Sequence, residues 1–81
     1  MKRYTIEVRV GLKKGVMDAE GETIAKSLNL LGYPVSNVST AKIYEVEVEA
    51  ESKEKAIELV NEACLKLLVN PVINNFQLRV K

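Results

Sequence analysis

The sequence predicts an α+β fold, a two-layer sandwich in which an antiparallel sheet carries two helices on one face, as a relative of the ferredoxin-like arrangement. Three stretches alternate apolar and polar residues, and two segments between them repeat apolar residues at helical spacing. Each strand is therefore half polar, which is typical of an antiparallel sheet with one face in water. A chain of 81 residues is expected to form a single domain over residues 1–81.

The first strand is expected over residues 2–10. Its even positions are apolar and its odd positions are polar, which is the period-two pattern of a strand with one wet face. The even set is Tyr4, Ile6, Val8 and Val10. Gly11 and Gly15 then break the alternation and indicate a loop.

The first helix is expected from Asp18 to about Leu31. The Asp18 carboxylate is placed to accept the free N–H groups of the first turn. Ile24, Leu28 and Leu31 recur at spacings of four and three, which predicts a buried stripe. Gly32 fits the end of this helix.

The middle stretch, residues 35–50, allows two interpretations. A single strand over residues 38–50 gives the order β-α-β-α-β, and a hairpin gives β-α-β-β-α-β. Val38, Thr40, Tyr44, Val46 and Val48 are all even-numbered, which favours continuity or else a loop with an odd number of residues. No Asn-Gly, Asp-Gly or Gly-Gly turn occurs, so one strand bent near Ala41 is favoured. A strand of this length is expected to serve more than one sheet or to extend to a partner chain.

The second helix is expected after Ser52, which is placed to cap it, and ends before Pro71. Its inward stripe is expected to be Ile57, Val60, Cys64 and Leu67. Leu59 and Leu65 widen the apolar face beyond what one small sheet needs, which suggests a partner. The last strand is expected over residues 75–81, where alternation returns.

Composition excludes several classes of function. The net charge of +1 lacks a run of like charge, so neither a nucleic-acid stripe nor a membrane patch is indicated, and no apolar run has the length of a signal peptide or membrane span. The sequence contains no histidine and one cysteine, Cys64, on the buried stripe, which argues against a metal site or a nucleophile in this chain. Glu45, Glu47 and Glu49 are interpreted as a solvated face. Cytoplasmic location and the absence of bound cofactors are the resulting expectations.

Two junctions between elements carry more specific information. The first junction, residues 15–21, lies in KKGVMDAEG (residues 13–21), and the second junction, residues 68–73, lies in CLKLLVNPVINNF (residues 64–76). Together, in a chain of this length, they resemble the signatures of the PurS family, the small subunit of phosphoribosylformylglycinamidine synthase. Family members often have a basic residue followed by Gly-Lys in the middle strand. Of that pattern this chain keeps only the lysine, Lys42, and the glutamate that follows it, Glu45.

The resemblance implies a non-catalytic subunit that dimerises or forms tetramers and bridges a glutaminase and a synthetase, supporting ammonia transfer in purine biosynthesis. ATP, Mg and glutamine are then expected on the other subunits. The residues expected to contact partners are Gly15, Val16, Asp18, Gly21, Lys42, Leu59, Leu65, Asn70 and Pro71. The alternative is a small ferredoxin-like regulatory domain that binds an effector at a dimer interface.

Overall fold

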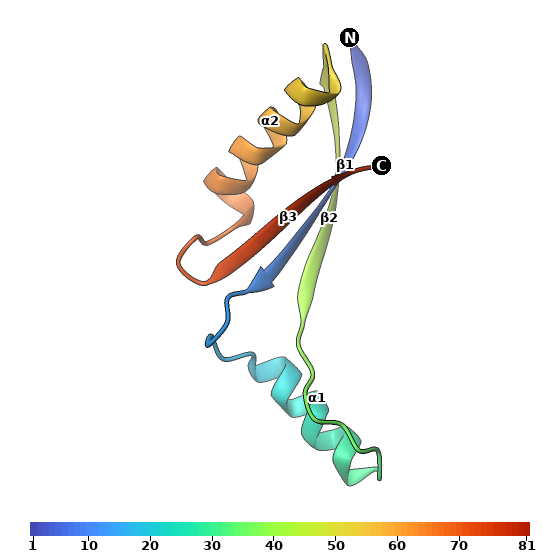
Figure 1. The fold of residues 1–81 in the computed structure, drawn as a ribbon, viewed down its shortest axis with the longest axis vertical. Helices are drawn as coiled ribbons and strands as arrows, with labels where there is room; N and C mark the ends of the chain where they lie inside the picture. Colours follow the sequence, from blue (N-terminus) through green and yellow to red (C-terminus); the bar gives the residue numbers. More distant parts are fainter.

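The computed structural model describes residues 1–81 and contains three strands and two helices (Figure 1). The elements are β1 (Lys2–Leu12), α1 (Ala19–Leu30), β2 (Ala41–Ala50), α2 (Lys53–Ala63), a π-helical turn η1 (Cys64–Leu68) and β3 (Asn74–Val80). The order β-α-β-α-β is confirmed. The middle stretch is one strand without a reversing turn, although it begins at Ala41 and not at residue 38.

The sheet has the order β2-β1-β3, and both outer strands run antiparallel to β1. The antiparallel α+β class is therefore confirmed. The register places Val8 of β1 between Tyr44 of β2 and Leu78 of β3, so the even-numbered residues of all three strands share one face. We call this the helix face, and the opposite face, formed by the odd-numbered residues, the polar face.

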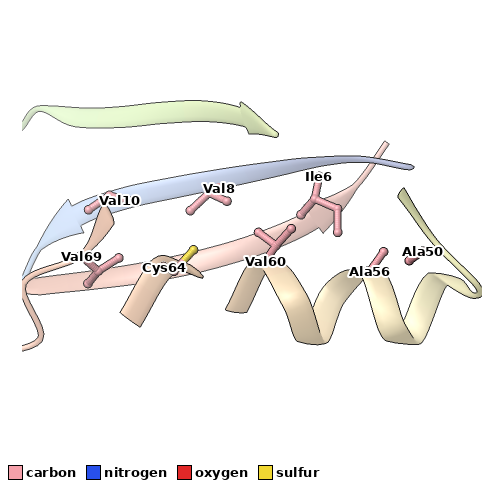
Figure 2. Packing of buried hydrophobic residues seen from close by; sticks show 8 residues of the cluster. All are labelled: Ile6, Val8, Val10, Ala50, Ala56, Val60, Cys64 and Val69. Atoms are coloured by element: carbon pink, nitrogen blue, oxygen red, sulfur yellow. The ribbon is translucent and has the colours of Figure 1, made fainter. Parts of the chain in front are cut away.

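The core lies between the helix face and α2 (Figure 2). Ile6 and Val8 of β1 are fully buried, as are Ala56 and Cys64 on the helical side. Ser52 caps α2 by accepting the Lys55 N–H at 3.1 Å, as expected. Only nine of the 81 residues are buried, so the chain alone has a small core.

The inward stripe predicted for the second helix is wrong at Leu67, because a π-helical turn interrupts the α-helical spacing. Val69 donates its N–H to the Cys64 carbonyl at 2.9 Å, five residues back, so one extra residue is inserted relative to α-helical spacing. The insertion rotates the following side chains by about one position. Leu68 becomes half-buried, and Leu67, expected inside, is 84% exposed.

Helix α1 lies beyond the end of the sheet, where Figure 1 shows it extending away from the strands. The expectation that both helices cover this chain's sheet is wrong for α1, since only α2 packs on it. Of the expected stripe, Leu28 is half-buried, whereas Ile24 is 39% and Leu31 73% exposed. The radius of gyration, 16.4 Å, exceeds the roughly 12 Å expected for a compact domain of this length.

The strand directions explain the difference between the two helices. Both β2 and β3 run antiparallel to β1, so they are parallel to each other, and α2 has to cross the sheet to connect their opposite ends. In contrast, β1 ends and β2 begins at the same end of the sheet, where Gly11 pairs with Ala41. Helix α1 and the returning segment 33–40 therefore form an excursion that need not cover the sheet.

Gly32 ends α1 as expected, with a φ of 97°. The N–H groups of Gly32 and Tyr33 bond to the carbonyls of Asn29 and Leu28 at 3.0 and 3.1 Å, which is the Schellman pattern. Neither helix combines the length and apolar character needed to cross a membrane.

Candidate functional site

The first junction turns β1 into α1. Gly15 has a φ of 88°, a conformation that other residues adopt at a cost, and Val16 donates its N–H to the Lys13 carbonyl at 3.1 Å to close the turn. Gly15 is exposed and Val16 is half-buried.

Asp18 caps α1 as predicted and also binds the returning chain. Its Oδ1 accepts the Gly21 N–H at 2.9 Å, while Oδ2 accepts both the N–H and the hydroxyl of Thr40, at 2.6 and 2.8 Å. Hydrogen bonds from the backbone of Gly21, and then from Thr40, hold the pKa of this carboxyl below its usual range. The side chain therefore joins the start of α1 to the start of β2.

Gly21 is buried where α1 passes close to the returning chain. A Cβ atom at this position would lie 2.2 Å from the carbonyl oxygen of Val38 and 3.0 Å from its carbonyl carbon. The first junction thus needs glycine here because two backbone segments touch.

The second junction is a tight turn held by asparagine side chains. The Asn70 side-chain oxygen accepts the Val72 N–H at 3.0 Å, and the Asn74 side-chain oxygen accepts the Asn70 N–H at 2.9 Å. The Asn74 amide donates to the Gly11 carbonyl at 3.1 Å, which ties the turn to β1.

Lys13 brings the two junctions together. Its backbone N–H donates to the Ile73 carbonyl at 2.8 Å, and its Nζ donates to the Pro71 carbonyl at 2.6 Å. Residues about 58 positions apart along the chain therefore meet at one end of the sheet.

Three other predicted contact residues lie outside the two junctions. Lys42 is exposed near the start of β2, beside Val10. Leu59 and Leu65 are 38% and 52% exposed on α2 and η1, so they are available to a partner.

Burial accounts for the one cysteine, and ion pairs account for the three glutamates of β2. Cys64 is fully buried in the core, and burial raises the pKa of its thiol. Glu45 bonds to Lys81, which lowers the pKa of this carboxyl, while Glu47 and Glu49 each lie 3.9 Å from Arg3. The prediction of a solvated glutamate face is confirmed by this arrangement.

Four residues that hold the junctions together were not singled out from the sequence: Lys13, Val38, Thr40 and Asn74. Thr40 and Val38 act through contacts with residues about 20 positions away, for which a single sequence carries no periodic signal. Asn74 follows Asn70 by four residues near a proline, and this spacing of turn-forming residues could have indicated its role.

Comparisons with known proteins agree with this geometry. Residues 5–81 match a family model described as PurS, phosphoribosylformylglycinamidine (FGAM) synthase. The chain is 44% identical over 79 residues to the phosphoribosylformylglycinamidine synthase subunit PurS of Methanocaldococcus jannaschii, covering 96% of this chain and 95% of that protein. Against the corresponding Archaeoglobus fulgidus subunit it is 45% identical over 73 residues, with 89% and 91% covered.

Solved structures show the same fold. A chain of the PurLQS structure from Thermotoga maritima matches with a TM-score of 0.91 and 40% identity, covering all of both chains. The M. jannaschii PurS crystal structure matches with a TM-score of 0.86 and 43% identity, covering 96% of this chain and 95% of that one. The paired junctions, the fold and the near full-length identity together show that this chain belongs to the PurS family.

Proposed function

We propose that this chain, a single domain over residues 1–81, is a non-catalytic assembly subunit of a phosphoribosylformylglycinamidine synthase complex. In this complex it bridges the glutaminase and synthetase subunits and supports ammonia transfer in purine biosynthesis. The carrying observation is the full-length likeness to a chain of the T. maritima PurLQS structure. The carbon–nitrogen ligase activity belongs to the complex, which uses ATP, Mg and glutamine on the other subunits in the cytoplasm.

The chemistry of the chain supports an assembly role. Glutamine hydrolysis needs an activated nucleophile, and the one thiol, Cys64, is buried with a raised pKa in a sequence without histidine. The specific residues at the two junctions are occupied in holding backbone segments together, as the three hydrogen bonds to Asp18 illustrate. Their role is to position surfaces for partners.

A second copy of the chain supplies the missing cover for α1. The large apolar side chains at its C-terminal end and just beyond it have little to pack against within the chain, since Leu30 is 89%, Leu31 73% and Tyr33 59% exposed. In addition, β2 is an edge strand of ten residues with one unpaired side. The proposed dimer covers α1 and continues the sheet at β2, which leaves Leu59, Leu65 and the exposed parts of the junctions for the other subunits.

Reconstitution tests the assembly role. Purified synthetase and glutaminase subunits are mixed with and without this chain, and glutamine-dependent product formation is measured. Ammonia-dependent product formation by the synthetase serves as the control. We expect the glutamine-dependent rate to require this chain, and equal rates in the two mixtures would refute the proposal.

Light scattering tests the dimer separately. We expect the wild-type chain to have at least twice the monomer mass, and Leu30→Ser with Leu31→Ser to shift it toward the monomer. Circular dichroism of the variant checks that the sheet is retained. A wild-type chain that is monomeric at micromolar concentration would contradict the dimer.

A further inference from the structure

The polar face of the sheet separates its charges along the strands. All four of its carboxylates lie toward the end where β1 begins, and each has a cation within 4 Å. The carboxylates are Glu7, Glu45, Glu47 and Glu49, and the cations are Arg3, Arg79 and Lys81. Each carboxylate in this part of the face has a cationic partner, and the four carboxylates and three cations leave a net charge of −1.

The opposite part of the polar face has one cation, Arg9, and no carboxylate. Arg9 lies between Ile43 of β2 and Gln77 of β3, and forms no ion pair. The next row contains Gly11 with Ala41 and Asn75, which are small or neutral. Arg9 Nη1 lies 3.7 Å from where a Gly11 Cβ would be, so the guanidinium extends over this glycine toward the first junction.

A hollow of about 560 Å³ opens where Arg9 extends. Its lining includes Arg9, Lys13 and Lys14 and two carboxylates, Asp18 and Glu22. Both oxygens of Asp18 already accept hydrogen bonds from Gly21 and Thr40, so they are committed. Lys13 uses one of its three donors on Pro71 and keeps two.

We propose that this cationic hollow receives a carboxylate-bearing segment of a partner subunit of the synthase complex. The inference rests on the proposed function and names the chemistry of one docking surface. The lining carries three cations and two carboxylates, a net charge of +1, and Asp18 turns both of its oxygens to Gly21 and Thr40, so an acidic segment is complementary in charge. Ile43, 52% exposed beside Arg9, offers an apolar contact next to the charges, which fits a polypeptide.

The location agrees with the proposed dimer. The apolar side chains that a second copy is proposed to cover, Leu30, Leu31 and Tyr33, lie at the C-terminal end of α1, whereas the hollow is lined by the first turn of α1 and by residues 37–40. Docking an acidic segment here therefore leaves the dimer intact. A charge-reversal variant at the hollow is expected to retain the wild-type oligomeric state.

A double charge reversal tests the docking surface. Arg9→Glu with Lys14→Glu is compared with Lys2→Glu with Lys53→Glu, which makes the same change in net charge at exposed cations near the opposite end of the sheet. Affinity for purified synthetase and glutaminase is measured at about 50 and 300 mM salt. We expect the hollow variant to bind one partner at least tenfold more weakly and the control variant to bind like wild type.

The wild-type affinity for that same partner is also expected to fall as salt rises, and the fall is expected to be smaller in the hollow variant. If the hollow variant and the control bind both partners equally well, the proposal is overturned. Arg9→Gln with Lys14→Gln replaces the reversal if circular dichroism shows that the reversed chain does not fold.

Two further readouts separate the alternatives. If inorganic phosphate stabilises wild type but not the hollow variant, and the two bind the partner subunits equally well, the hollow is a small-anion site. This result would overturn the docking proposal. Reconstituted glutamine-dependent activity separates this inference from the assembly role. If wild type supports activity and the hollow variant does so equally at limiting concentration, the docking site is wrong while the assembly role stands.

Discussion

Replacing Gly21 with alanine tests the close contact between α1 and the chain that returns to β2. Gly21 does not have a positive φ, so the change adds a methyl group without backbone strain. Helix propensity alone predicts that alanine stabilises α1 by up to about 1 kcal/mol. The structure predicts the opposite sign, because the new Cβ would lie 2.2 Å from the Val38 carbonyl oxygen.

The size of the effect follows from this distance. Ordinary van der Waals contact begins at 3.4 Å, so the two segments have to separate by about 1.2 Å, and a backbone oxygen cannot rotate away. Overpacking of this kind costs about 1–3 kcal/mol. After a gain in propensity of up to about 1 kcal/mol, we expect the free energy of unfolding to fall by about 0–2 kcal/mol. The melting temperature should fall by up to roughly 15 °C.

Urea denaturation followed by circular dichroism measures the change, at one protein concentration because association alters apparent stability. Ser27→Ala is the matched control, since it raises helix propensity at an exposed position of α1. If Gly21→Ala is as stable as Ser27→Ala, the close contact does not constrain this position and the reasoning is refuted.

Two other predictions concern the hydrogen bonds at the junctions. Asn74→Ala should lower the free energy of unfolding by about 1–3 kcal/mol in urea denaturation, because the Asn70 N–H and the Gly11 carbonyl lose their partner. Asn75→Ala is the control and should have little effect. Equal losses in the two variants would contradict this role of Asn74. The pKa of Asp18 is lowered in the folded state by Gly21 and Thr40, so its stabilisation is present above about pH 4 and is lost as pH falls through the folded pKa. Asp18→Asn should therefore lose less stability than wild type on acidification from pH 5 to about pH 2, and parallel curves would count against the cap.

The strands and caps could be predicted from sequence because their causes are local. Alternation in β1 and β3 reflects one buried and one wet face, and the structure has strands within two residues of the expected bounds. Asp18 and Ser52 cap their helices through backbone groups three residues away. Even parity through β2 correctly favoured one strand over a hairpin.

Leu67 shows where a periodic argument fails. An α-helical spacing of three from Cys64 places Leu67 inside, but the π-helical turn adds a residue and exposes it. The turn lets Leu68 pack against the core and Val69 become buried before Pro71. A preference for this turn depends on tertiary packing, which no local pattern in the sequence records.

The position of α1 was missed for a different reason. An apolar stripe predicts that something covers the helix, and the expectation from the sequence is that the chain's own sheet does so. The contacts show that only α2 has this role. The stripe predicts a covered surface, and one sequence does not distinguish cover by the same chain from cover by another.

The position of α1, away from the core, also implies that it opens more readily than the sheet in a free chain. The sheet and α2 share a core of their own, whereas α1, with 12 residues, lies at the lower end of the roughly 12–15 residues below which an isolated helix is marginal in water. In a free chain, α1 depends on its two caps and on the contact at Gly21. Its amide hydrogens should therefore exchange earlier than those of β1, and association should slow their exchange more than that of any other element.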